Sequence, residues 1–490
     1  MSITRNFIFS AILTASSYIF PFIIFPYVSR ILGPDNIGAC DFVDSLINYF
    51  MLVSTLGVSW VGIREIASCR DDREKLNRVF TSLVVITSVS TFVAAVLLVA
   101  FTCFVPSFAV YRPLLFIGLL KLVGNFFLIE WFYRGLEDFK YITVRTILVK
   151  IGYMAGVFMF VRTASDYSIY YFLLCAMVVV NAIVNCWKAA GIVRLDFTRL
   201  QIRPFLKPLF VFCLYFGLST MYTTFNTTYL GIVGDDTQVG YFATANKFFG
   251  VIISIYAAFT GVMMPRLTSL NAQNEEKEFH RLISLSYDVL MMFAFPILIF
   301  GIIFADQLVM LFAGGQYGGA VIPMRIMMPL VLIIGYEQII VLQILAPKKK
   351  DRAIFTNALL GSIVGVVLNI VLVPGMLVVG TSITWVCAEI VVMLSAQYFV
   401  WRYTGLGFPF RMLMKYVIAY LPMAVIEFII FRNIQIGTVG MIMTGFVVMA
   451  IYMAIVQCLV LKTEATLFFE GKIVTFFKNR CNIGKGVIKP

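Results

Sequence analysis

The ionisable side chains inside long apolar stretches are the groups of this sequence that could do chemistry. Lys121 and Lys247 each lie within such a stretch, and Arg30 lies at the edge of another. A charged side chain is costly when it faces lipid, so each cation should face a polar cavity or an ionic partner. Lysine and arginine both bind phosphate, and arginine can do so through two parallel hydrogen bonds. The pattern therefore indicates a phosphate-binding cavity or a set of structural ion pairs.

Each cation could either line a phosphate-binding cavity or serve a structural role. Lys247 lies roughly 12 Å into its expected helix, so it would line a cavity, form a structural pair or extend back to the membrane surface. Arg30 would contact a substrate or act as an anchor at the outer rim. Lys121 would contact a substrate or pair with a residue of a neighbouring helix. Arg64, which precedes Glu65 near a loop, is a further cavity candidate, or a charge that sets topology.

Several uncharged or acidic groups accompany the cations. Glu337 and Glu389 lie in mid-span, and Asp44 lies near the start of a span. These carboxylates would couple transport to Na⁺ or H⁺, or pair with the lysines. Asn226 lies among hydroxyl-bearing residues, where it would line a cavity wall or form hydrogen bonds between helices. The single histidine, His280, lies in a charged segment, and the nine cysteines lack metal-ligand spacing. We therefore expect no metal site, no catalytic residues and no cofactor.

Apolar helices must position these residues. The 490 residues are 61% hydrophobic and 13% charged, and the mean hydropathy is +0.94. Crossing the hydrocarbon core takes about 20 apolar residues. We predict an all-α integral membrane protein with about fourteen spans. Their ranges are 7–29, 42–63, 79–104, 111–133, 143–161, 168–188, 206–231, 239–265, 283–305, 320–346, 353–374, 377–401, 411–431 and 437–461.

The loop charges test this count. With the N-terminus in the cytoplasm, the cytoplasmic segments hold 31 of the 38 lysines and arginines, and the outer loops and rims hold five. This asymmetry is what the positive-inside rule expects, and omitting one helix would scramble it. Both termini are therefore expected in the cytoplasm. The net charge of +13 is explained by topology, so we expect the lipid bilayer and not nucleic acid as the partner.

Two segments two hundred residues apart resemble each other. Residues 31–38 and 232–240 both follow an odd-numbered span, contain Gly and Asp in a tight turn, and end in a glycine, and the second segment has one extra residue. The offset is six helices, which would give both halves the same orientation. Parallel repeats with a binding site between them are a known plan of transporters, although Gly/Asp turns between helices are common.

Several motifs together resemble the polysaccharide-type flippases, which transport O-antigen and other repeat units and are related to the multidrug and toxic compound extrusion (MATE) proteins. No single motif decides this, but their order along residues 5–460 is specific. The motifs are YVSRILGP at 27–34 with Gly38, LG at 56–57 with GIRE at 62–65, EWFYRGLE at 130–137 with YI at 141–142, VGYF at 239–242 with ANK at 245–247, MPRL at 264–267, and Pro374 with Gly380 and Glu389.

The resemblance implies a MATE-like architecture of two parallel six-helix lobes and two extra C-terminal helices. We expect an N-lobe at 1–204, a C-lobe at 205–405, two further spans at 406–461 and a basic cytoplasmic tail at 462–490. The implied function is translocation of undecaprenyl-diphosphate-linked oligosaccharides to the outer leaflet of a bacterial inner membrane. Glycan polymerases and glycosyltransferases would be further partners.

Two other functions fit parts of the pattern. An ion-coupled drug or metabolite antiporter would share the fold, but its cavity should favour carboxylates because many drugs are cationic. A membrane enzyme such as a polymerase would need a large outer loop to hold sugars. The longest outer loop, near residues 305–319, is short and carries one acidic residue, Asp306. We therefore expect a transporter and not an enzyme.

Overall fold

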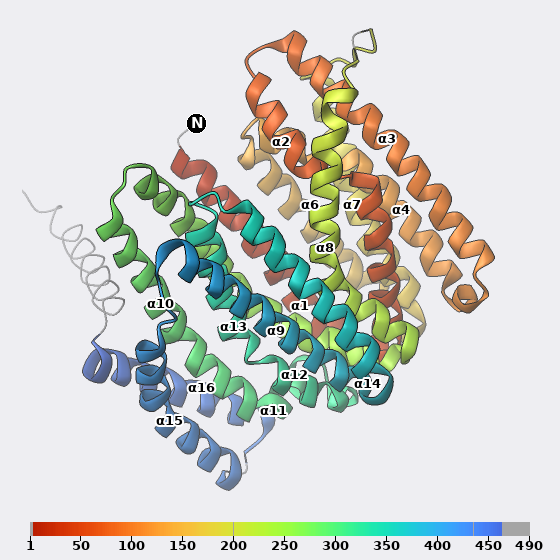
Figure 1. Cartoon of the computed structure of the whole chain (residues 1–490). Helices are drawn as coiled ribbons and strands as arrows, with labels where there is room; N and C mark the ends of the chain where they lie inside the picture. Colours follow the sequence, from red (N-terminus) through yellow and green to blue (C-terminus); the bar gives the residue numbers. More distant parts are fainter. Residues whose placement is uncertain (1–2, 199, 435, 463–490) are drawn as a thin grey trace, which may run out of the picture. The chain divides into compact units, whose positions relative to one another are not determined.

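The computed structural model describes residues 3–198, 200–434 and 436–462, and the regular elements of this part of the chain are all helices (Figure 1). The predicted all-α class is therefore confirmed. The basic tail predicted at 462–490 lies, after Lys462, outside the described residues.

The described residues contain nine helices long and apolar enough to cross a membrane, or up to eleven if each of two bent helix pairs is one span. Two very long helices each extend over two predicted spans, in whole or in part. They are α1 (Ile3–Thr55), which is interrupted at Gly33, and α14 (Asp351–Thr404), which is interrupted at Leu377. The multi-pass character follows from these helices, whereas the number of fourteen spans stays a prediction.

The turns between paired spans are tighter than the sequence suggests. Between the spans predicted at 7–29 and 42–63, Gly33 alone leaves helical geometry, with φ +78°, and Pro34 already lies within the following helix. Glycine accepts this left-handed φ, and proline suits the first turn of a helix because its missing N–H has no partner there. Between the spans predicted at 353–374 and 377–401, Pro374 stays helical and Leu377 alone leaves helical geometry, with φ 47°.

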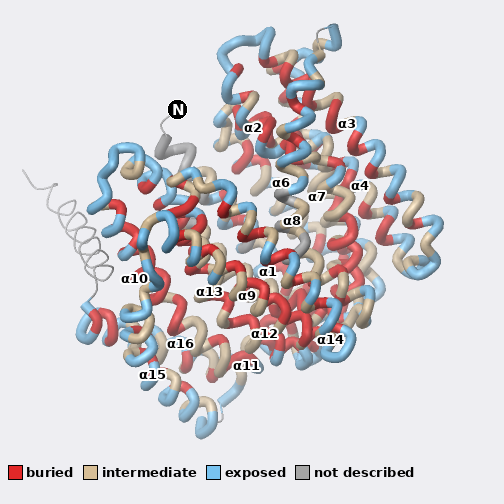
Figure 2. Tube along the Cα trace, in the orientation of Figure 1, coloured by how far each residue is buried: buried red, intermediate tan, exposed pale blue. Residues whose placement is uncertain are grey.

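The helices group into two compact units. The first comprises residues 1–254, 312–327 and 355–391. Its α1 packs against α3, α4, α6 and α8, and buried residues gather along the second part of α1 (Figure 2). Besides α1 and part of α14, its elements are α2 (Val58–Cys69), α3 (Arg73–Phe104), η1 (Pro106–Tyr111), α4 (Arg112–Leu128), α5 (Glu130–Gly135), α6 (Phe139–Phe160), η2 (Ala164–Asp166), α7 (Tyr167–Ala190), α8 (Arg203–Val233), the first half of α9 (Asp236–Ala272), η3 (Gly315–Ala320) and α12 (Val321–Met327).

The second unit comprises Ile255–Leu311, Met328–Ile354 and the described residues from Val392 onward. In it α10 packs against α13, α15 and α16. An aromatic and methionine core that includes Phe295, Tyr416 and Tyr420 joins them. The elements are the rest of α9 and of α14, α10 (Glu276–Ile303), α11 (Ala305–Phe312), α13 (Leu330–Gln338), η4 (Ile339–Leu345), α15 (Phe410–Asn433), α16 (Thr438–Ile455) and η5 (Val456–Leu461). The lobe boundaries expected from the sequence stay a prediction.

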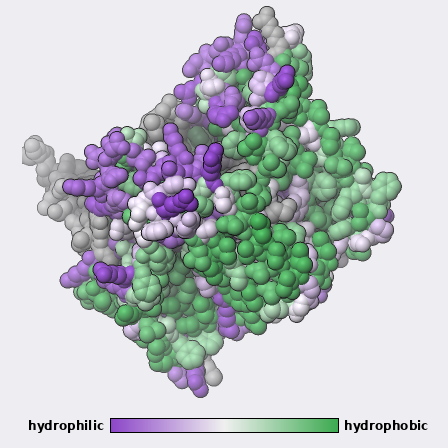
Figure 3. All heavy atoms as spheres, in the orientation of Figure 1, coloured by the Kyte–Doolittle hydropathy of each residue, from purple (hydrophilic) through white to green (hydrophobic). Residues whose placement is uncertain are grey.

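The outward faces of the helices suit lipid. On α3, Phe92 is 70% exposed and Val89 60% exposed. Hydrophobic side chains cover the length of α3, whereas hydrophilic ones gather near the turn between α2 and α3 (Figure 3). At that turn the Asp72 side chain accepts hydrogen bonds from the backbone N–H groups of Glu74 and Lys75, which caps the start of α3. The charged residues at this turn thus mark the start of α3, just before its apolar stretch begins.

Candidate functional site

Two lysine–aspartate ion pairs meet on one face of α1. Asp41 and Asp44 lie three residues apart, so they occupy neighbouring positions on the helix surface. Lys247 of α9 places its Nζ 2.6 Å from Asp41 Oδ2, and Lys121 of α4 places its Nζ 2.6 Å from Asp44 Oδ1. The structure therefore brings together Asp44, Lys121 and Lys247 of the predicted site, with Asp41 added.

The Lys121–Asp44 pair is the more enclosed of the two. The side chains are 12% and 25% exposed. Lys121 also approaches Asn48 Oδ1 at 3.4 Å, and the Tyr171 hydroxyl donates to Asp44 at 3.3 Å. This small network satisfies the charges inside the helix bundle, as a structural pair should. The structural interpretation of Lys121 thus has a defined geometry.

The Lys247–Asp41 pair is more open. The Lys247 side chain is 27% exposed and that of Asp41 is 31% exposed. The Lys247 ammonium lies 4.5 Å from the centre of the Phe25 ring, a cation–π contact. A cation held by one carboxylate and one aromatic ring keeps donors free for an anion, because an ammonium group has three.

The other predicted cavity residues lie in different settings. Arg30 is exposed near Gly314, and its guanidinium donates to the Pro26 carbonyl at 3.1 Å. Arg64 is an exposed residue paired with its neighbour Glu65 at 2.8 Å. Asn226 is buried within α8, where its Oδ1 accepts a hydrogen bond from Asn369 of α14 at 2.7 Å. This last contact matches the interpretation of Asn226 as a helix–helix link.

The two predicted carboxylates belong to different units. Glu389 lies in the part of α14 within the first unit, is 3% exposed, and accepts a hydrogen bond from the Trp385 indole at 3.0 Å. Glu337 lies in α13 of the second unit and is half-buried. Their proposed coupling roles stay predictions.

The two similar turns of the sequence touch each other. A Cβ added to Gly38 would lie 1.6 Å from the Asp236 carbonyl oxygen, and one added to Gly240 would lie 2.2 Å from the Pro34 carbonyl oxygen. The Thr237 hydroxyl also donates to the Asp35 carboxylate. Backbones this close require glycine. The contact is reciprocal, as expected for two copies of one motif that face each other.

The breaks also differ by one residue, as the sequence suggests. The helix before the first turn ends at Leu32 and the next begins at Pro34, whereas α8 ends at Val233 and α9 begins at Asp236. Sequence reasoning did not select Asp41 for the site, although its spacing from Asp44 was visible. The sequence does not show that Lys247 pairs with Asp41, because the two residues lie about two hundred positions apart.

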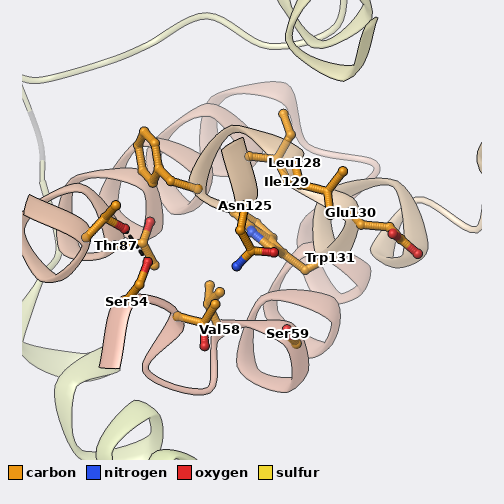
Figure 4. Close-up of a pocket in the computed structure, with 12 residues that line it drawn as sticks. Ser54, Val58, Ser59, Thr87, Asn125, Leu128, Ile129, Glu130 and Trp131 are labelled. Atoms are coloured by element: carbon orange, nitrogen blue, oxygen red, sulfur yellow. Dashed lines mark hydrogen bonds between the residues drawn. The ribbon is translucent and has the colours of Figure 1, made fainter. Parts of the chain in front are cut away.

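A small polar cavity lies where two helices of the first unit are interrupted. Leu56 and Gly57 separate α1 from α2, and Ile129 separates α4 from α5, all with positive φ. Figure 4 shows Asn125 pointing into the cavity between Ser54 and Glu130. Its volume of about 80 Å³ is well below the roughly 300–1,000 Å³ of ligand pockets. The cavity suits water beside a double helix break, and not a sugar.

The sequence of the chain is similar to that of known proteins. Residues 3–271 match the model of a family described as "Polysaccharide biosynthesis protein". Two curated relatives carry the name "Putative O-antigen transporter". One, from Escherichia coli strain K12, is 25% identical over 397 residues, 80% of this chain and 95% of that protein. The other, from Shigella dysenteriae, is 21% identical over 372 residues, 74% and 90% of the two chains.

Solved structures share the fold. The lipid II flippase MurJ, in an inward closed conformation, matches with a TM-score of 0.70 at 16% identity, covering 92% of this chain and 98% of that one. An inward-facing multidrug resistance MATE family transporter of the MOP superfamily matches with a TM-score of 0.57 at 17% identity, covering 79% and 98%. The predicted MATE-like fold is therefore confirmed, whereas the number of spans and the division into lobes stay predictions.

Proposed function

The chain belongs to the polysaccharide biosynthesis protein family, and from this premise we propose that it is a flippase for lipid-linked oligosaccharides. The similar proteins are named as O-antigen transporters and as a lipid II flippase, which supports transport and not catalysis. The substrate proposed in detail is an undecaprenyl-diphosphate-linked repeat unit. It would move from the cytoplasmic to the outer leaflet of a bacterial inner membrane, with both protein termini in the cytoplasm.

The observation that carries the proposal is the half-open Lys247–Asp41 pair on α1. A diphosphate carries more negative charge than one carboxylate, so it would compete for the Lys247 ammonium. The aromatic face of Phe25 keeps the ammonium in place during the exchange. Lys247 would thus release Asp41 and take the diphosphate, while the polyprenyl chain stays in lipid.

Alternating access is the mechanism we propose for the release of the glycan. The reciprocal contact between the turns at Gly38 and Gly240 would act as a closed gate at the outer side. Separating these turns would break the hydrogen bond between Thr237 and Asp35 and open a path outward. Movement of parallel repeats against each other is an established plan for such transport. Coupling to Na⁺ or H⁺ through Glu337, Glu389 or Asp44, and cooperation with a glycan polymerase, are further parts of the proposal.

The test is glycan export in a strain that lacks the gene. We expect lipid-linked repeat units to accumulate on the cytoplasmic side of this strain, and the wild-type gene to restore export. Lys247→Ala and Arg30→Ala variants, present at wild-type levels in the membrane, should restore less. Full export by both variants would refute recognition by these charges.

A drug-efflux assay separates the flippase from an antiporter of the same fold. If the deletion strain loses ethidium efflux without accumulating lipid-linked repeat units, the antiporter function is correct and the flippase proposal fails. Gly152→Ala serves as the control for the Lys247→Ala and Arg30→Ala variants, because the added methyl group would meet no atom within 4 Å.

A further inference from the structure

A pocket of about 530 Å³ lies between the first turns of α6 and the last turns of α7, outside the ion pairs of α1. We propose that this pocket binds the phosphate headgroup of an anionic phospholipid from the surrounding bilayer. Its size falls within the roughly 300–1,000 Å³ of ligand pockets. The charge pattern of the loops places this end of both helices at the cytoplasmic surface.

The lining of the pocket carries an excess of positive charge. Lys140, Arg145 and Lys188 line it, with one carboxylate, Asp138, which pairs with Lys188. Two positive charges therefore have no matching carboxylate within the lining. Basic pockets between membrane helices on the cytoplasmic side are typical sites for anionic lipid headgroups.

Arg145 is the deepest of these cations. Its side chain is 4% exposed, yet Nε and Nη1 have no hydrogen-bond partner among the residues that the structure describes. The remaining nitrogen, Nη2, donates to Thr146 at 2.9 Å and lies 3.9 Å from Glu130. A buried guanidinium with two unsatisfied nitrogens is costly, and its uncompensated charge beside the pocket would favour an anionic group there.

Tyr141 lies one turn before Arg145 on α6 and also lines the pocket. Its hydroxyl donates to the Val184 carbonyl of α7 at 3.1 Å, so the ring bridges the two helices. The Lys188 ammonium lies 3.5 Å from the centre of this ring, and the Arg145 guanidinium lies 5.8 Å from it. The Tyr141 ring thus keeps the Lys188 and Arg145 side chains close to each other in the pocket without a ligand.

The chains of a phospholipid have an apolar surface to follow. Val144 and Leu148 line the pocket and are 46% and 62% exposed, and on α7 Ile183 is 63% exposed. Trp187, next to Lys188, is 83% exposed, as expected for an aromatic residue at the membrane interface. The side chains of the lining are cations, one carboxylate, apolar groups and a tyrosine whose hydroxyl is bonded, which favours a phosphate with acyl chains over a sugar.

Native mass spectrometry of the purified full-length protein tests this site. We would titrate dioleoylphosphatidylglycerol and dioleoylphosphatidylcholine, which share their chains and differ in net charge. Wild type should bind phosphatidylglycerol preferentially. Lys140→Gln should weaken that binding about fivefold, because one basic residue near the membrane surface contributes about that factor, and Arg145→Gln should weaken it further.

Lys75→Gln is the matched control, because Lys75 is also an exposed lysine in the first turn of a helix at the expected cytoplasmic side. It should leave lipid binding unchanged. Lys140 is exposed, so its variant keeps the test decisive if the Arg145 variant does not fold. Equal binding of the two lipids, or an unchanged affinity in Lys140→Gln, would overturn the proposal. Displacement of phosphatidylglycerol from this pocket by stoichiometric undecaprenyl diphosphate would instead assign the pocket to the transported lipid.

Discussion

Two carboxylates three residues apart on α1 hold lysines in different ways. Asp44 and Lys121 share a network with Asn48 and Tyr171, whereas Asp41 and Lys247 share only an aromatic neighbour among the contacts described above. The enclosed pair suits stability, because its charges are satisfied inside the bundle. The open pair suits ligand exchange, because its lysine keeps donors free.

Binding of undecaprenyl diphosphate should distinguish the two members of the open pair. Lys247→Ala should weaken binding about tenfold or more, because a hydrogen bond to a charged group contributes about 1.5–3 kcal/mol. Asp41→Asn should not weaken it, because it removes the competitor of the diphosphate. The measurement is a binding titration of purified protein. Equal weakening in both variants would show that the pair is structural.

Unfolding should report on the enclosed pair. Removing one partner leaves a buried charge, so we expect Lys121→Met to lower the free energy of unfolding by about 2–4 kcal/mol. The double variant Lys121→Met with Asp44→Asn should lose clearly less than the sum of the two single variants. Denaturant unfolding in detergent measures all three proteins. Additive losses would mean that the two residues do not stabilise each other.

At the scale of elements, the chain uses single residues to reverse or interrupt its helices. Gly33 and Leu377 each divide a helix of more than 50 residues, and Gly57 and Ile129 interrupt neighbouring helices beside one small cavity. Short breaks leave few backbone groups to satisfy inside a membrane, where each unsatisfied group is costly. Gly38 and Gly240, in the first turns of the helices that follow two of the breaks, can then meet the opposite backbone.

An alanine substitution at Gly240 should test the close contact between the segments around Gly38 and Gly240. Gly240→Ala would place a methyl group 2.2 Å from the Pro34 carbonyl oxygen, so the two turns must separate. We expect strongly reduced export at normal membrane levels, and greater access of a water-soluble thiol reagent to a cysteine introduced at Ile37, which is 1% exposed while the two segments are in contact. Gly152→Ala, with open space around the added methyl, should retain both properties. Unchanged reagent access in Gly240→Ala would argue against a closed gate at these turns.

At the scale of the molecule, the distribution of positive charge predicts how the chain crosses the membrane. Loops that hold 31 of the 38 lysines and arginines alternate with loops that hold few. This pattern requires an even number of spans between the two cytoplasmic termini. The long helices of the structure are compatible with it, because α1 and α14 each contain an internal reversal point.

Reporter fusions check this topology. A green fluorescent protein fused after Asp138 should fluoresce, because that loop is expected in the cytoplasm. Alkaline phosphatase fused after Pro106 should be active, because that segment is expected outside. The reverse pair of fusions serves as the control and should be inactive. Activity on the opposite sides would overturn the predicted orientation.

The sequence by itself determined the helical class and the family, and it predicted to within a few residues where paired spans are divided. These depend on local quantities, namely the length of apolar runs, the sign of loop charges and the order of short motifs. It also singled out Lys121, Lys247 and Asp44 as ionisable residues that require partners. It did not identify those partners, because ion pairs between helices depend on which residues meet after the chain has folded.

The tertiary structure decided which carboxylate meets which lysine, and that the two similar turns lie against each other. Asp41 and Lys247 are 206 residues apart, and no local pattern links them. In the sequence, nothing distinguishes Lys140, Arg145 and Lys188 from other cytoplasmic charges. Only the packing of α6 and α7 around Tyr141 brings them together. The local sequence shows that a charged side chain lies within an apolar span, where its burial is unfavourable. The packing of the helices decides which opposite charge or ligand compensates it.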